Sequence, residues 1–144
     1  MATLIAYVDS SVLLRIVLGQ TAALRDFDSI DVAVSSALLQ LEVTRTLDRL
    51  WLRREITDDE LALKTARAGE TLNRFVTLEL DQLVIDIAAQ GLPTPLATLD
   101  ALHLASAMLY RQSQPAGQPE IVIATHDHAF ASAARAMHFD VIGA

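Results

Sequence analysis

Hydrophobic and polar residues alternate along the chain in short blocks that predict strands and helices in turn. Short apolar and β-branched runs, such as Ile121 to Ala124, are typical of strands buried on both faces of a parallel sheet. They predict strands over residues 4–8, 31–35, 76–80, 121–124 and 140–142. Apolar residues at helical spacing predict helices over 12–18, 37–51, 58–74, 82–90, 99–111 and 129–137, and a polar helix is expected around 21–29.

Residues that start or stop helices lie at most of the expected helix ends. Thr57 with Glu60 three positions on forms a capping box. Gly19 and Gly91 follow two helices and are expected to stop them. Further expected caps precede three more helices: Ser35 or Ser36, Asp81 and Thr98.

Strands that alternate with helices predict an α/β fold. We expect a single domain over residues 1–144, with a central, mostly parallel sheet of about four or five short strands flanked by helices. In open α/β sheets, ligands bind beyond the carboxyl ends of the strands. Asp9 follows the first expected strand and Asp127 follows the fourth, so both acids are expected at one edge of the sheet.

Composition narrows the chemistry. Hydrophobic residues make up 52% of the chain, with 5 Gly and 4 Pro, which indicates a globular protein with a sizeable core. The absence of cysteine excludes disulfide scaffolds, thiolate zinc sites and cysteine nucleophiles. We see neither a signal peptide nor an apolar run of the ~20 residues that span a bilayer, so we expect a cytoplasmic protein without membrane contact.

The charge balance is acidic. Eighteen acidic and eleven basic residues give a formal net charge of −7. Taken alone, this excess argues against a nucleic-acid partner, because lysine and arginine drive phosphate binding. Carboxylates that hold metal ions offset part of the argument, since their charge is neutralised when the ions bind.

Four acidic residues lie in positions that invite a functional interpretation. Asp9 and Asp127 can each cap the helix that follows them. Glu42 lies in an apolar run, where the alternative is a surface pair with Arg45, worth about 0.2–0.5 kcal/mol. Asp100 lies in a first helical turn, where an acid suits the helix dipole. Together, four carboxylates expected near one sheet edge indicate a site for a hard cation such as Mg²⁺.

Four segments of the chain resemble a known family, the PIN domains. Nearly the whole chain is covered, in the family's order and spacing, and the block from Asp100 to Ala105 is the most specific part. The matching segments are Ile5 to Ser11, Ser35 to Arg45, Thr98 to Ala105 and Ile123 to Asp127. One departure lies at His138-Phe139, where such sequences often carry a glycine.

Among PIN domains, the chain looks most like the small VapC-type toxins of toxin–antitoxin pairs. The resemblance implies an endoribonuclease that depends on Mg²⁺ or Mn²⁺, is inhibited by a cognate antitoxin and commonly forms a homodimer. It also implies that the acidic constellation consists of Asp9, Glu42, Asp100 and Asp127. Ser11 and Thr125 match hydroxyl positions that support the site.

The expected reaction is hydrolysis of RNA phosphodiester bonds. Asp9 and Asp100 are expected to bind the principal metal, while Asp127 and Glu42 complete the site. The candidate phosphate contacts are Arg15, Arg45 and Arg49, with a solvated helix face as the alternative.

The histidines and the apolar helices can each be interpreted in two ways. His103 is either a proton shuttle or a packed core residue, and we favour the second. His126 and His128 flank Asp127, but without cysteine or a third histidine nearby they indicate zinc only weakly. Apolar residues over 12–18 and 47–63 form either a surface for an antitoxin or second subunit, or plain core.

Three rival functions remain. A haloacid-dehalogenase-like phosphatase wants a second acid two residues after the first, where this chain has Ser11. A receiver-like signalling domain that binds Mg²⁺ wants paired acids in the first loop and a suitable lysine, and the sole lysine is Lys64. The third is a catalytically silent PIN-like scaffold, which the presence of all four acids disfavours.

Overall fold

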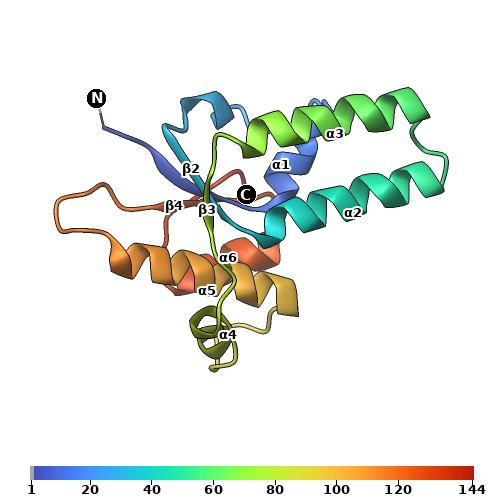
Figure 1. The fold of residues 1–144 in the computed structure, drawn as a ribbon. Helices are drawn as coiled ribbons and strands as arrows, with labels where there is room; N and C mark the ends of the chain where they lie inside the picture. The colour runs from blue at the N-terminus through green and yellow to red at the C-terminus, as the bar shows by residue number, and fades with distance from the viewer. Residues whose placement is uncertain (1) are drawn as a thin grey trace.

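Strand β1 (Ile5–Val8) is the central strand of the sheet, and every one of its side chains is buried. The computed structural model describes residues 2–144, and Figure 1 shows their fold. Four further strands pair with β1 or with its neighbours: β2 (Val32–Ser36), β3 (Val76–Leu78), β4 (Val122–Ala124) and β5 (Val141–Ile142). Their order is β3-β2-β1-β4-β5, and every pair is parallel. The expected α/β fold is confirmed.

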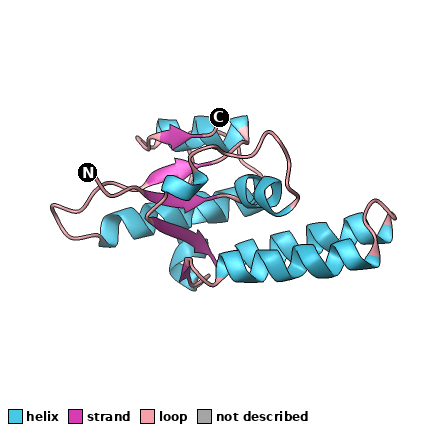
Figure 2. Ribbon diagram, turned by 90° about the horizontal axis from the view of Figure 1, so that it is seen from above, coloured by secondary structure: helices cyan, strands magenta, loops and turns pink. Residues whose placement is uncertain are grey.

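Helices cover both faces of this sheet. They are α1 (Ser10–Val17), α2 (Leu38–Leu52), α3 (Asp58–Leu72), α4 (Gln82–Ala88), α5 (Thr98–Ser113) and α6 (His128–Ala136). Helices α1, α2 and α3 contribute to one core, and α5 and α6 contribute to the other. Helices α2 and α3 lie side by side and project beyond the sheet as a hairpin (Figure 2).

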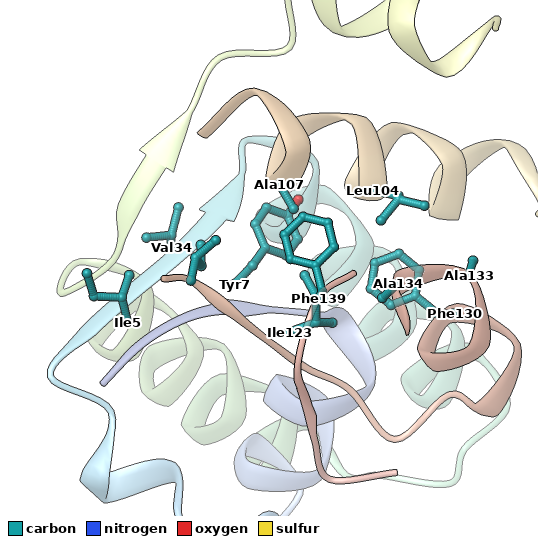
Figure 3. Close-up of a cluster of buried hydrophobic side chains, with 11 residues drawn as sticks. Ile5, Tyr7, Val34, Leu104, Ala107, Ile123, Phe130, Ala133, Ala134 and Phe139 are labelled. Atoms are coloured by element: carbon teal, nitrogen blue, oxygen red, sulfur yellow. The ribbon is translucent and has the colours of Figure 1, made fainter. Parts of the chain in front are cut away.

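The two cores follow from the alternation of side chains along β1. Ile5 and Tyr7 point to the face covered by α5 and α6, whereas Ala6 and Val8 point to the face covered by α1 and α2. Figure 3 shows the first core, in which Tyr7 lies between the sheet and α5. Asp9 continues the alternation on the Tyr7 side, at the point where the strand ends.

Some of the expected helix caps are present in the structure and others are not. The capping box of Thr57 and Glu60 is present, and Asp81 accepts a hydrogen bond from Val84 N at 3.1 Å. The expectation for Thr98 was wrong, because Thr98 is the first helical residue and Ala97 precedes it without a side-chain cap. Helix α4 ends at Ala88, so Gly91 does not stop it.

Ser35 and Ser36 are the last residues of β2, so neither is the N-cap of α2. The N-cap is Ala37, which forms no side-chain hydrogen bond. Ser36 Oγ still accepts from Leu38 N at 3.2 Å, whereas Ser35 Oγ donates to the carbonyl of Val8 at 2.9 Å. The hydroxyl of Ser35 therefore joins two parallel strands rather than beginning a helix.

The expected helix over residues 21–29 was wrong. This segment consists of turns and one short 3₁₀ helix, η1 (Phe27–Ser29). Leu24, Phe27 and Ile30 recur at intervals of three and pack partly buried against the core. An interval of three matches tight turns closed by hydrogen bonds between residues three apart, which is the pattern the backbone forms here.

The two apolar segments singled out in the sequence have different environments. Val12, Leu13 and Val17 are fully buried, so α1 is core. Trp51, Leu52 and Leu63 remain 40%, 71% and 58% exposed on the α2–α3 hairpin. The described part of the chain contains no helix with both the length and the apolar character to cross a bilayer.

Helices α1 and α6 end in the same hydrogen-bonded turn. After α1, Gly19 has φ +67, and the N–H groups of Gly19 and Gln20 donate to Ile16 and Arg15. After α6, His138 takes the equivalent position with φ +67, in the left-handed region that favours glycine. The His-Phe departure noted in the sequence is therefore a site of local backbone strain.

We predict that His138→Gly stabilises the protein by roughly 0.5–1 kcal/mol. The left-handed conformation costs a residue with a side chain about 1–2 kcal/mol, and the greater freedom of glycine in the unfolded chain offsets part of that gain. Gly19→Ala is the matched control and should destabilise the protein, although its added Cβ would meet no atom within 4 Å. Urea denaturation measures both effects, and a destabilising His138→Gly would contradict the argument.

Candidate active site

The carboxylate of Asp9 is buried at the carboxyl end of β1, with 3% of the residue exposed. Its Oδ2 accepts hydrogen bonds from Ser11 Oγ and from Thr125 Oγ1, both at 2.8 Å. Asp9 occupies the N-cap position of α1 but makes no side-chain capping bond. The capping alternative for Asp9 is therefore wrong.

Both hydroxyls are themselves oriented by the backbone. Ser11 Oγ accepts from the N–H of His126 at 3.0 Å, and Thr125 Oγ1 accepts from the N–H of Asp127 at 3.0 Å. Since each hydroxyl accepts from a fixed N–H, its single proton is free to point at Asp9. The loop after β4 thus holds one oxygen of Asp9, while Oδ1 accepts no hydrogen bond from residues 2–144.

Asp127 follows β4 and serves as the N-cap of α6. Its Oδ1 accepts from the N–H of Phe130 at 3.0 Å, so the capping alternative is confirmed for this residue. Capping uses one carboxylate oxygen and leaves the other for a second role. Of the adjoining histidines, His128 is exposed, whereas His126 Nδ1 lies 2.9 Å from the carbonyl oxygen of Gly143 and its Nε2 is buried without a hydrogen-bond partner among residues 2–144.

The pKa of Asp100 shows that the four acids lie close to one another. The pKa of Asp100 is raised from 3.8 to about 6, chiefly by burial and then by the charges of Asp9, Asp127 and Glu42, while His103 acts in the opposite direction. The structure therefore brings all four sequence-predicted acids within electrostatic reach of one another. Neither lysine nor arginine pairs with these acids, since within residues 2–144 the sole contact of the salt-bridge type links Glu42 to His103.

Glu42 does not pair with Arg45, so the surface-pair alternative is wrong. Its Oε1 accepts a hydrogen bond from Nε2 of His103, which is fully buried, while 17% of the Glu42 side chain is exposed. The other ring nitrogen of His103 lies 2.6 Å from the hydroxyl of Tyr7. His103 is thus a packed and satisfied core residue, as expected, but its partner is an acid of the site.

Two of the three candidate arginines line a hollow together with one of the acids, Glu42. Glu42, Arg45 and Arg49 line one hollow of about 290 Å³, together with Ser10 and Leu99, the sequence neighbours of Asp9 and Asp100. Arg15 lies outside this lining and donates to the carbonyl of Ala22 at 3.1 Å. The hollow joins positive side chains of α2 to the edge that bears the carboxylates.

Comparison with known proteins assigns this arrangement to a family. The family profile described as PIN domain matches residues 6–136, which include all four acids. The chain belongs to the PIN-domain family. Within that family it is similar to Ribonuclease VapC46 of Mycobacterium tuberculosis, with 36% identity over 104 residues, or 70% of this chain and 72% of the relative. The resemblance to VapC-type PIN domains is therefore confirmed.

Two solved structures share the fold of this chain. A chain described as "Toxin-antitoxin complex from Klebsiella pneumoniae" superposes with a TM-score of 0.62 at 18% identity, covering 88% of this chain and 90% of its own. PAE2754 from Pyrobaculum aerophilum gives a TM-score of 0.57 at 18% identity, covering 90% and 84%. At these identities the likeness extends to the fold alone.

PIN-domain ribonucleases generally use divalent metal ions, and the donor set here fits such an ion. Within residues 2–144, no three histidine, aspartate or glutamate side chains converge closely enough to enclose a cation. Mg²⁺ commonly binds one or two carboxylates and keeps several waters, so a closed protein cage is not required. The free Oδ1 of Asp9 and the crowded carboxyl of Asp100 provide oxygen donors of that kind.

Sequence reasoning gave Tyr7 no role at the site. Two spacings in the sequence could have indicated that Tyr7 and His103 lie near the acids. Tyr7 precedes Asp9 by two residues on a strand, so the two side chains share a face. His103 follows Asp100 by three residues on a helix, which also places these side chains on neighbouring positions.

We predict that Asp100→Asn stabilises the metal-free protein at pH 7. The folded-state pKa of about 6 lies above the ordinary 3.8, so a favourable contribution to stability is complete below pH 3.8 and is lost as the pH rises to about 6. Asparagine carries no charge, so it removes both the unfavourable burial of the ionised carboxylate and its repulsion by the other acids. After allowance for solvent screening of this half-buried group, the gain is about 1 kcal/mol.

Urea denaturation in EDTA at pH 7 and at about pH 3.5 checks this prediction. The variant and the wild type should differ at pH 7 and converge at the lower pH. Equal stability at pH 7 would mean that burial and the neighbouring acids do not disfavour the ionised carboxylate of Asp100, contrary to what the structure implies.

Proposed function

We propose that this protein is a metal-dependent endoribonuclease and the toxin of a VapBC-type toxin–antitoxin pair. The observation that carries the proposal is the set of four neighbouring carboxylates, which lacks a lysine or arginine ion pair within residues 2–144. Membership of the PIN-domain family and the similarity to Ribonuclease VapC46 support the same activity. Mg²⁺ or Mn²⁺ is the proposed cofactor, because hard cations prefer carboxylate and water ligands.

The proposed reaction is hydrolysis of an RNA phosphodiester bond. Water adds to phosphorus, a P–O bond to one ribose oxygen breaks, and that oxygen receives a proton, which leaves a phosphate monoester and a hydroxyl. A bound divalent ion supplies Lewis acidity, since it polarises the phosphoryl oxygen and lowers the pKa of its water. Asp9 and Asp100 are the proposed principal ligands, with Asp127 and Glu42 completing the site.

The side chains of the protein prepare this site before RNA arrives. Ser11 and Thr125 fix Oδ2 of Asp9, so its other oxygen keeps one direction. Arg45 and Arg49 line the hollow beside Glu42, where they are proposed to contact RNA phosphates. Two local arginines answer part of the objection raised by the net charge of −7, because the positive charge is concentrated where the substrate is proposed to bind.

The exposed apolar residues of the α2–α3 hairpin are the proposed contact for an antitoxin. Trp51 and Leu52 line a hollow at the tip of this hairpin, and Leu63 is also exposed. The description of the Klebsiella pneumoniae relative as a toxin–antitoxin complex suggests the kind of partner. A homodimer is proposed as well, and exposed Leu83 and Ile85 on α4 offer a second apolar surface for it.

We predict that the purified protein cleaves RNA in the presence of Mg²⁺ or Mn²⁺ and that Asp9→Asn lowers the rate by roughly 100-fold or more. Asparagine keeps the shape of the side chain but loses the charge that binds the ion. The measurement is cleavage of a labelled RNA, with circular dichroism to verify folding. EDTA should abolish cleavage by the wild type, and added Mg²⁺ or Mn²⁺ should restore it.

Asp59→Asn is the matched control, because Asp59 is an exposed acid on α3 outside the cluster, and it should cleave at the wild-type rate. Undiminished cleavage in EDTA would contradict the metal mechanism, and full activity of Asp9→Asn would contradict the site. A phosphatase of the haloacid-dehalogenase type is disfavoured, since its second acid is replaced by Ser11, which instead donates to Asp9.

A further inference from the structure

A buried chain of hydrogen bonds runs from the central strand to one acid of the site. Tyr7 on β1 and His103 on α5 are both fully buried, and Tyr7 Oη lies 2.6 Å from His103 Nδ1. The other ring nitrogen of His103 bonds to Oε1 of Glu42 on α2. The chain therefore connects three elements that lie far apart in the sequence, and it ends at a carboxylate proposed to complete the metal site.

The direction of each hydrogen bond follows from the chemistry of the groups. An ionised carboxylate only accepts, so His103 must carry its proton on Nε2 and donate to Glu42. In a neutral imidazole the other nitrogen then accepts, and it needs a donor. Tyr7 supplies one, because its hydroxyl lies 2.6 Å from Nδ1 and a phenol keeps its proton at neutral pH. Tyr7 thus selects the tautomer that His103 requires to bind Glu42.

Packing fixes the imidazole in space as firmly as the hydrogen bonds fix its tautomer. The rings of Tyr7 and His103 meet edge to face, with centroids 5.7 Å apart and planes at 72°. Figure 3 shows Tyr7 held among the buried side chains beneath α5. Glutamate, by contrast, has three rotatable side-chain bonds, and within residues 2–144 His103 is the sole hydrogen-bond partner of the Glu42 carboxylate.

We infer that His103 is a positioning residue for the nuclease site, which aims the carboxylate of Glu42 into the acidic cluster under the control of Tyr7. The inference rests on the proposed function for the use of that carboxylate, but the hydrogen-bond chain itself does not. One oxygen of Glu42 is held by the imidazole, the other accepts no hydrogen bond from residues 2–144, and the residue lines a hollow with Arg45 and Arg49. The arrangement parallels the way Ser11 and Thr125 hold Asp9.

The first test concerns the hydrogen bonds and needs neither metal nor RNA. Nitrogen-15 NMR of the imidazole in the metal-free protein at pH 7.5 should show a protonated Nε2 and an unprotonated Nδ1 on His103. Tyr7→Phe, which removes only the hydroxyl, should shift the ring towards a mixture of tautomers. A wild-type ring protonated on Nδ1 alone, or a ring unaffected by Tyr7→Phe, would overturn the inference.

The second test separates positioning from mere packing. His103→Leu introduces an apolar side chain of similar size and leaves Glu42 without a hydrogen-bond partner. His103→Gln instead restores a donor near the place of Nε2. We expect His103→Leu to weaken Mn²⁺ binding and to lower kcat, each by about 10–100-fold, with little change in KM for RNA. His103→Gln should recover most of both losses. Leu104→Val, an equally buried change on the same helix, controls for a general loss of packing.

Each outcome bears on one claim. If His103→Leu matches Leu104→Val in Mn²⁺ affinity and kcat, or if His103→Gln is as defective as His103→Leu, the positioning role is wrong. If His103→Leu does not fold, Tyr7→Phe carries the same comparison and is expected to weaken Mn²⁺ binding in the same direction. If the wild type cleaves no RNA, the proposed function fails, while the tautomer and Mn²⁺ affinity still decide the role of His103.

Discussion

The hydrogen bonds from Ser11 and Thr125 to Asp9 join the ends of two neighbouring parallel strands, and the rest of the site is arranged around them. Strand β1 delivers Asp9, and the loop after β4 delivers Thr125 and the backbone N–H groups that orient both hydroxyls. Gly143 lets the chain after β5 approach this loop, because a Cβ there would lie 2.7 Å from the carbonyl oxygen of Thr125. A buried carboxylate is therefore held in place before any ion binds it.

The same arrangement makes the metal-free protein carry an electrostatic cost. Burial and the charges of Asp9, Asp127 and Glu42 raise the pKa of Asp100, and among residues 2–144 neither lysine nor arginine pairs with these acids. A fold selected for stability alone would separate or pair such charges. Helix α5 presents Asp100 to the cluster and His103 to Glu42, so one helix sets both the repulsion and the orientation of the fourth acid.

Sequence reasoning recovered the fold and the grouping of the acids because both depend on local patterns. Buried apolar runs identify parallel strands, and an acid directly after a strand is carried to the sheet edge with it, as Asp9 and Asp127 show. The partner of Glu42 was missed, since His103 lies 61 residues away and sequence offers Arg45 as a nearer ion-pair partner.

Helix caps were harder to predict, because several polar residues can satisfy the same N–H groups. The hydroxyl of Ser35 donates to the backbone of β1 instead of capping α2, and Thr98 is the first residue of α5 rather than its N-cap. The helix expected over residues 21–29 gave way to turns because packing every third residue outweighed local propensity.

The central claim is that the four carboxylates form the site of a divalent cation. Anomalous diffraction from crystals of the protein soaked in Mn²⁺ tests it most directly, because the signal locates the ion without reference to activity. We predict a peak within coordination distance, about 2–2.5 Å, of the free oxygen of Asp9 and next to Asp100, and no such peak in crystals of Asp9→Asn. A fully occupied peak elsewhere, with no density between Asp9 and Asp100, would contradict it.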